Sequence, residues 1–419
     1  MPQICGMFFS RQRFFLSLLL LIGASAFAQT QLPTGRWLFT LSRPGGQPVY
    51  VDADLRIQGD SGYLEFLNDT ERMAVPPFHL GADSIRFAMP LFETRFSLSR
   101  AADGHLAGTL SKGVSTGYQV WQVEAKHGSG PRIPVAAGEP LVNLSGRWAL
   151  EFQRPDGSWR PAVAELKQEG ARLTGTIINP SGDYRFLEGA VWGRQFYLTA
   201  FDGAHIYALR ADVPGDSIIA NGIFFSGTAP GDRFRARRDE KAQLPALAPV
   251  AEMKPGEQYL RFRFPDLDSN MVSLQDPRFR NKVVIVQLMG SWCPNCMDET
   301  KFLSEFYNGQ STRDVEIVSL AYELSTDFHR SAGSLRKFQQ RFNVQYPMLV
   351  TGARSADNDK AAKTLPQLTD IKYFPTTIFI DKRGRVRKVH NGFYGPGAPD
   401  YHEAYRQSFF SIINELKAE

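Results

Sequence analysis

The residues best placed to do chemistry are two cysteines in the C-terminal third of the chain. Cys293 and Cys296 form a C-x-x-C pair that directly follows an apolar run at 283–289 and opens a helix-like stretch. This pattern predicts a strand that delivers the pair to the N-terminus of a helix. The first peptide N–H groups of a helix are unpaired and its dipole favours negative charge, so a thiolate at Cys293 is stabilised at neutral pH. The predicted chemistry is dithiol–disulfide exchange.

Two other uses of the cysteine pair fit the sequence poorly. A zinc site would need two more ligands, yet the chain has no second cysteine pair, and His329, His390 and His402 show no paired ligand spacing. A structural disulfide between residues so close together would close a short loop and remove little unfolded-state entropy. The leading prediction is therefore a redox-active pair that needs no metal and no other cofactor.

The first residues of the chain differ from the rest. Arg11 and Arg13 precede an apolar stretch at 14–22, and small residues dominate 24–28. The segment 1–28 is typical of a cleavable secretory signal, which predicts export to the periplasm or cell envelope. The alternative is an uncleaved membrane anchor, although the apolar stretch is shorter than the ~20 residues that span a bilayer.

Composition limits the class of protein further. A length of 419 residues suggests two or three domains, and 43% hydrophobic with 22% charged residues is ordinary for a folded soluble protein. The formal net charge of +5 is a slight excess over a large mixed population. Because no run of Lys and Arg stands out, we expect no nucleic-acid partner.

An internal repeat organises the N-terminal two thirds. Gly35–Trp37 recurs as Gly146–Trp148 and Arg43-Pro44 recurs as Arg154-Pro155 at a constant offset without a gap. Each copy consists of short alternating runs punctuated by Gly, Asp and Asn, which predicts an antiparallel meander closed into a barrel or folded into a sandwich. A ligand-binding cavity in these units is an alternative to a filled, structural core.

Changes of composition and period divide the chain. We predict all-β units at 34–127 and 144–239, joined and followed by Pro-, Ala- and Gly-rich linkers at 128–143 and 240–260. Over 261–419 strand-like and helix-like segments alternate, which predicts an α/β sheet covered by helices.

The C-terminal motifs resemble a known family. Trp292–Cys296 after a core strand looks like the active site of the thioredoxin superfamily, and Tyr373–Thr377 before a strand resembles its cis-proline loop. Phe264–Asp268 and the signal-like segment make 261–419 most similar to the exported TlpA/ResA-like branch. The resemblance implies a thioredoxin-like fold for this part and does not extend to the β repeats.

The resemblance also implies roles for individual residues. Cys293 would attack to form a mixed disulfide and Cys296 would resolve it. Pro375 would be cis and would lie beside the thiols. Asp298 is most simply a favourable charge in the first turn of the helix.

Several further residues are expected near the site. Trp292 would form one side of the active site, although it could equally serve packing alone. Pro294 would lie in the first helical turn, and Phe374 would also lie near the substrate. Glu299, three residues after Cys296, matches an acidic residue that serves proton transfer in TlpA/ResA-like proteins; the alternative is an exposed helix carboxylate. Glu323, just beyond a predicted strand, is a weaker candidate of the same kind.

Together these features predict an exported thiol–disulfide oxidoreductase that exchanges disulfides with substrate proteins, by resemblance as a reductant. Apocytochromes are candidate substrates and a membrane electron donor is a candidate partner. One alternative is a thiol peroxidase, which would need an oxyanion-binding surround that C-x-x-C does not itself provide. Another is a binding protein whose β repeats carry the function, since aromatic residues such as Trp148, Trp159 and Tyr197 permit a site there.

Overall fold

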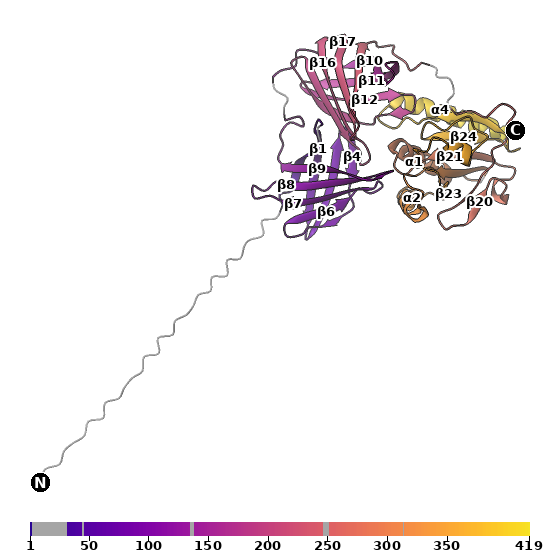
Figure 1. Ribbon diagram of the computed structural model, residues 1–419, viewed down its shortest axis with the longest axis horizontal. Helices are drawn as coiled ribbons and strands as arrows, with labels where there is room; N and C mark the ends of the chain where they lie inside the picture. Colours follow the sequence, from indigo (N-terminus) through magenta and orange to yellow (C-terminus); the bar gives the residue numbers. More distant parts are fainter. Residues whose placement is uncertain (2–31, 44–45, 135–137, 246–250, 313) are drawn as a thin grey trace. The chain divides into compact units, whose positions relative to one another are not determined.

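A computed structural model describes the chain except for residues 2–31, 44–45, 135–137, 246–250 and 313. Apart from Met1, the predicted signal segment at 1–28 therefore lies outside the described residues. Among the residues that are described, no helix is both long and apolar enough to cross a membrane. Pro33–Glu419 holds two β units, coloured indigo to rose in Figure 1, followed by an α/β domain in orange to yellow.

The first β unit is one antiparallel sheet that curls into a half-barrel, with strand order β4-β3-β2-β1-β9-β8-β7-β6 and β5 paired to β3. The isolated bridge between Leu80, which follows β5, and Ile85 of β6 links the two ends of this sheet. Trp121, Val123 and Ala125 of β9 are buried while the residues between them are exposed, as the twofold period of a strand requires. The strands are β1 (Gly35–Ser42), β2 (Val49–Gln58), β3 (Ser61–Asn68), β4 (Glu71–Ala74), β5 (Phe78–His79), β6 (Ser84–Ala88), β7 (Thr94–Arg100), β8 (Leu106–Val114) and β9 (Gly117–His127).

The second β unit is a closed barrel, because β11 pairs with β12 as well as with β10. Its strand order is β11-β10-β18-β17-β16-β15-β14-β12-β13. Aromatic and aliphatic side chains such as Trp148, Phe152 and Phe234 are buried in its core. The strands are β10 (Gly146–Gln153), β11 (Trp159–Glu169), β12 (Arg172–Asn179), β13 (Gly182–Asp183), β14 (Leu187–Trp192), β15 (Gln195–Phe201), β16 (Ile206–Gly215), β17 (Ile218–Ser226) and β18 (Asp232–Arg238).

The sequence repeat reproduces the same local geometry in both units. Trp37 donates its indole N–H to Pro33 O at 3.1 Å, and Trp148 donates to Leu144 O at 3.0 Å. The glycine that opens each copy has a positive φ, +102° at Gly35 and +123° in the second copy, a conformation that side chains with a Cβ rarely adopt. The predicted fold class, tandem β units and then an α/β domain, is confirmed; the second unit is a closed barrel and the first a half-barrel.

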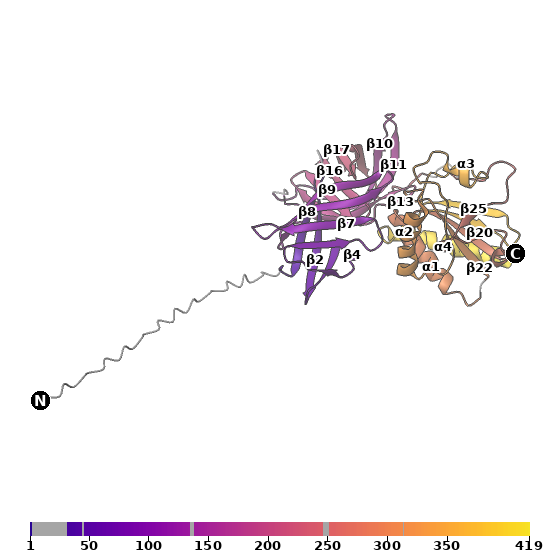
Figure 2. The same cartoon turned by 60° about the horizontal axis from the view of Figure 1, so that its bottom comes forward.

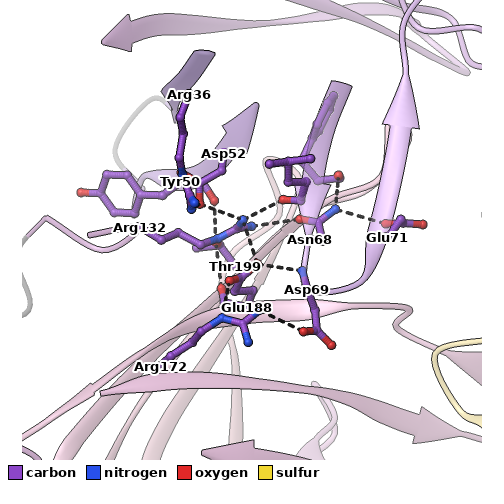
Figure 3. A network of polar contacts seen from close by, with 12 residues as sticks. Arg36, Tyr50, Asp52, Asn68, Asp69, Glu71, Arg132, Arg172, Glu188 and Thr199 are labelled. Atoms are coloured by element: carbon purple, nitrogen blue, oxygen red, sulfur yellow. Dashed lines mark hydrogen bonds and ion pairs between the residues drawn. The ribbon is translucent and has the colours of Figure 1, made fainter. Parts of the chain in front are cut away.

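A buried arginine in the segment between the β units joins them (Figure 3). Arg132 donates to Asn68 Oδ1 of the first unit at 2.9 Å and lies 3.5 Å from Glu188 Oε2 of the second. Glu188 in turn accepts from the backbone N–H of Asp69 at 2.7 Å and from Arg172 Nε at 2.9 Å. A buried charge needs such paired and hydrogen-bonded surroundings. Arg132 therefore stabilises the contact between the two β units.

The α/β part, here called the redox domain, is built on a central sheet of order β23-β22-β21-β24-β25. β21 and β22 are parallel, while β24 and β25 form an antiparallel hairpin. Its strands are β19 (Arg263–Pro265), β20 (Met271–Ser273), β21 (Val283–Met289), β22 (Val315–Ala321), β23 (Met348–Val350), β24 (Thr376–Ile380) and β25 (Val386–Asn391). Its helices are α1 (Pro294–Asn308), α2 (Phe328–Phe342), α3 (Lys360–Thr364) and α4 (Pro399–Ala418), with a short 3₁₀ turn at Pro277–Phe279.

Every residue of β21 is buried because the sheet is covered on both faces. Val283 and Ile285 join the core that α1, α2 and α4 complete, whereas Val284 and Val286 join the core on the α3 side. Figure 2 shows α3 on one side of the sheet and α1 and α2 on the other. Leu260, inside the predicted linker at 240–260, is buried in the α3-side core, so the end of that segment packs with the redox domain.

Candidate active site

The cysteine pair lies at the start of α1, as predicted from the apolar run and the spacing. β21 ends at Met289, Cys293 is the N-cap of α1, and Pro294 takes the first helical position, where a missing N–H costs no hydrogen bond. Cys293 Sγ accepts from the backbone N–H of Cys296 at 3.3 Å. Both cysteines are free thiols. The backbone N–H of Cys296, in the first turn, therefore points at the sulfur that would carry negative charge.

The two thiols differ in environment. Cys293 keeps 6% of its surface exposed, and Cys296 is fully buried. Burial raises the pKa of the Cys296 thiol well above its usual range, and the nearby Cys293 and Glu299 raise it further. The arrangement suits Cys293 as the sulfur that meets a substrate and Cys296 as the one that reacts second.

The cis-proline loop lies beside Cys293. The Phe374–Pro375 peptide bond is cis, as predicted, and Cys293 Sγ lies 3.6 Å from Phe374 O. The rings of Trp292 and Phe374 meet edge to face with centroids 5.7 Å apart, and the Trp292 indole N–H donates to Tyr322 O at 2.9 Å. The structure thus brings together all the residues proposed to contact substrate, and Trp292 is held by both packing and a hydrogen bond.

Glu299 is fully buried below the thiols, so the alternative of an exposed helix carboxylate is wrong. Its carboxylate accepts hydrogen bonds from Thr377 Oγ1, from Gln287 Nε2 at 2.9 Å and from Tyr405 Oη at 3.1 Å. Burial raises the pKa of Glu299 to about 7, although these hydrogen bonds act against the rise. A carboxyl group with this pKa can both accept and donate a proton near neutral pH.

Glu323 is a second buried carboxyl near the site. It accepts from the backbone N–H of Ser291 at 2.8 Å and from Ser291 Oγ at 2.6 Å, which fixes the turn between β21 and α1. Burial raises the pKa of Glu323 to about 7, and the bonds from Ser291 lower it in part. Glu323 therefore supports the turn two residues before Cys293.

Asp298 is not the first-turn charge that the sequence predicted, because α1 begins at Pro294 and has no acidic residue in its first turn. Its side chain is 12% exposed and is paired with Arg185, a residue between β13 and β14 of the second β unit. Arg185 is also paired with Glu71 of the first unit. Burial raises the pKa of Asp298 to about 7, while Arg185 lowers it in part. The expectation failed because the first turn of α1 ends before residue 298, and the Asp298 carboxylate instead pairs with a distant part of the same chain.

Asn295, between the two cysteines, also contacts the second β unit. Its side-chain amide donates to Asp183 O at 3.3 Å and to Phe393 O at 3.0 Å. The Asp183 carboxylate accepts from the backbone N–H of Gly395 at 2.6 Å. Sequence patterns missed Asp183 and Arg185 as neighbours of the site, since neither shows a spacing or motif that points to the cysteines.

Comparison with known proteins agrees with this geometry. Residues 254–405 match the family model described as Redoxin. The thiol-disulfide oxidoreductase ResA of Halalkalibacterium halodurans is 24% identical over 139 residues, which covers 33% of this chain and 69% of that protein. ResA of Geobacillus thermodenitrificans is 28% identical over 131 residues, 31% of this chain and 66% of that protein. A solved structure of a putative thiol:disulfide interchange protein DsbE from Chlorobium tepidum covers 39% of this chain and 99% of its own, with 18% identity and a TM-score of 0.29.

The chain therefore carries a C-terminal Redoxin domain of the thioredoxin-like type. This domain places the protein among the thiol–disulfide oxidoreductases. The matched residues contain both cysteines, the cis-proline loop and Glu299, and they do not include the two β units.

Proposed function

We propose that the protein is an exported enzyme that reduces disulfides of substrate proteins in the periplasm or cell envelope. The observation that carries the proposal is the position of Cys293 Sγ, at the N-terminus of α1 and 3.6 Å from Phe374 O, with Cys296 buried one turn further in. The signal-like segment at 1–28 supports export, and the similarity to proteins named ResA supports the reductive direction. Apocytochromes and a membrane electron donor remain candidate partners.

The reaction follows from the two sulfurs. The Cys293 thiolate attacks one sulfur of a substrate disulfide, forming a mixed disulfide and releasing the first substrate thiolate, which takes up a proton. The Cys296 thiolate then attacks Cys293 Sγ, which releases the second substrate thiolate and leaves a Cys293–Cys296 disulfide. Two electrons pass to the substrate, and a donor thiol must return them to the pair. Glu299 receives the proton that Cys296 loses, since its pKa of about 7 suits that transfer.

The direct test is stoichiometric reduction of a protein disulfide. We expect the fully reduced protein to reduce insulin faster than the double variant Cys293→Ser, Cys296→Ser, with one substrate disulfide reduced per cysteine pair oxidised. Insulin precipitation reports reduction of the substrate disulfide, and thiol titration reports oxidation of the cysteine pair. Equal rates for the protein and the double variant would contradict the proposal.

The binding-protein alternative receives less support from the second β unit. A surface depression of about 940 Å³ lies there, lined by Trp159, Ile218 and Arg235 among others. Arg235 is already bonded to Glu151 at 2.8 Å and lies 4.1 Å from the centroid of the Trp159 ring. Arg235 and the Trp159 ring are therefore engaged with each other, and neither cysteine lines the depression.

A further inference from the structure

Two loops of the β units contact the face of the redox domain that bears the thiols. Leu91 and Phe92, between β6 and β7, and Ala204, between β15 and β16, are buried in the same hydrophobic cluster as Cys293 and Cys296. We call these two loops the cover. Since Cys293 is only 6% exposed, the cover leaves little of the nucleophile open to solvent.

Polar contacts hold the cover in place. Glu93, next to Phe92, accepts two hydrogen bonds from Arg330 of α2, with Nε at 3.0 Å and Nη2 at 2.6 Å, and a third from Ser334 Oγ at 3.3 Å. Such a bidentate pair between a guanidinium and a carboxylate has a defined geometry as well as a favourable energy. The Glu93–Arg330 pair therefore fixes the first loop against α2.

The two loops are also fixed to each other and to α1. Thr94 Oγ1 donates to Gly203 O at 2.7 Å, which joins the first loop to the second. On the other side of the site, Asp298 of α1 is paired with Arg185 of the second β unit. The redox face is thus attached to the β units on both sides of the cysteine pair.

A pocket of about 340 Å³ remains beside Trp292, and Phe92, Lys112, His205 and Glu323 contribute to its lining. This size is at the lower end for small-molecule sites. Neither cysteine lines this pocket, so in the closed arrangement the sulfur is reached through the 6% of Cys293 that stays exposed, which is enough for a small thiol or disulfide and too little for a folded protein.

We propose that the cover makes the cysteine pair size-selective, with Glu93 and Phe92 as specificity-determining residues and the Glu93–Arg330 pair as its latch. Small thiols and disulfides reach Cys293 in the closed arrangement. Folded protein disulfides react only after the loops separate from the redox domain. This inference rests on the proposed disulfide exchange and names the condition under which protein substrates gain access.

The test compares a small and a bulky reagent that carry the same reactive group. Reduced protein in a Cys5→Ser background, where Cys293 and Cys296 are the remaining thiols, is alkylated with N-ethylmaleimide or with a polyethylene-glycol maleimide. The latch is broken with Glu93→Arg, which places two cations together, and is restored with the double variant Glu93→Arg, Arg330→Glu. Glu151→Arg is the matched control because it reverses a carboxylate in an exposed ion pair of the second β unit.

We expect Glu93→Arg to raise the rate ratio of bulky to small reagent by about tenfold, the change that a closed-to-open shift of about 1.4 kcal/mol produces. The double variant should return the ratio toward the parent value, and Glu151→Arg should leave it unchanged. Glu93→Gln, which removes the charge without changing the shape, serves if Glu93→Arg does not fold. If the rate ratio of bulky to small reagent is the same in the parent, in the latch variants and in the urea-unfolded chain, the two loops do not restrict access to Cys293 and the proposal is wrong.

The same variants separate this inference from the proposed function. Reduction of a small disulfide such as hydroxyethyl disulfide should be similar in the parent and in Glu93→Arg, while insulin reduction should rise in Glu93→Arg alone. If no variant reduces either disulfide, the proposed disulfide exchange is wrong. The alkylation ratio would still show whether the cover restricts access of bulky reagents to Cys293. If both disulfides respond equally to Glu93→Arg, size selection is wrong and the exchange stands.

Discussion

Cys296→Ser should accumulate a stable mixed disulfide between Cys293 and substrate, and its turnover should fall to the rate of the uncatalysed exchange. The reason is positional. Cys293 caps α1, where the N–H of residue 296 donates to its sulfur at 3.3 Å, while the Cys296 thiol is fully buried and its pKa is raised by burial. Without the second sulfur, the mixed disulfide has no internal route to resolution.

Non-reducing electrophoresis followed by mass spectrometry identifies the trapped sulfur. The companion variant Cys293→Ser should trap nothing, and a Cys5→Ser background removes the third cysteine of the chain. If Cys293→Ser traps substrate as well as Cys296→Ser does, the roles of the two cysteines are reversed.

Glu299→Gln should slow the exchange by about 100-fold, the scale of a lost general acid–base group. Glu299 is buried with a pKa raised to about 7, and its charge is one of the causes that raise the pKa of the Cys296 thiol. The amide should therefore lower the pH at which the thiols become reactive while removing the group that accepts their proton. Because neighbouring titrations are coupled, the pH shift belongs to the group of sites.

Iodoacetamide alkylation from about pH 5 to about pH 10 tests the first effect, and single-turnover reduction of a disulfide tests the second. Glu305→Gln, a carboxylate further along the same helix, is the matched control. Superimposable alkylation curves together with unchanged exchange rates would leave Glu299 without a role in the chemistry.

The same substitution should change stability with a defined sign. The folded-state pKa of Glu299, about 7, lies above its ordinary value of 4.5, so between these values the folded protein binds more protons than the unfolded chain. The free energy of unfolding therefore falls as pH rises through this window, by on the order of 3 kcal/mol for this group. Glu299→Gln removes the penalty, so urea unfolding should show a smaller loss of stability between about pH 5 and about pH 8 than in the parent. An identical loss of stability between these pH values in the parent and in Glu299→Gln would contradict this prediction.

Local signals in the sequence predicted the centre of the redox domain. A largely apolar strand is expected wherever a sheet is covered on both faces, and β21, with Gln287 as its polar exception, has this arrangement. The two-residue spacing then places Cys293 at the helix start and Cys296 one turn further in, as observed. The repeat predicted two similar β units because a glycine and a tryptophan at matching positions need the same backbone geometry in each copy.

Contacts between distant segments could not be predicted in this way. Arg185 and Asp298 are far apart in sequence, and neither belongs to a motif or to an amphipathic period that would link them. Arg132 lies in a segment whose Pro, Ala and Gly content indicated only a linker, yet its guanidinium bridges the β units. The presence of Phe92 in the same hydrophobic cluster as the two cysteines likewise depends on contacts that become visible only once the chain is folded.

The reduction potential of the Cys293–Cys296 pair, measured by equilibration with glutathione or dithiothreitol buffers, tests the central claim most directly. We predict a single two-electron transition in which both thiols are lost together, at a potential near the ~−270 mV of thioredoxin. A potential near the ~−120 mV of a strong oxidant would contradict the reductive direction. Failure of the two cysteines to form a disulfide with each other would contradict the account as a whole.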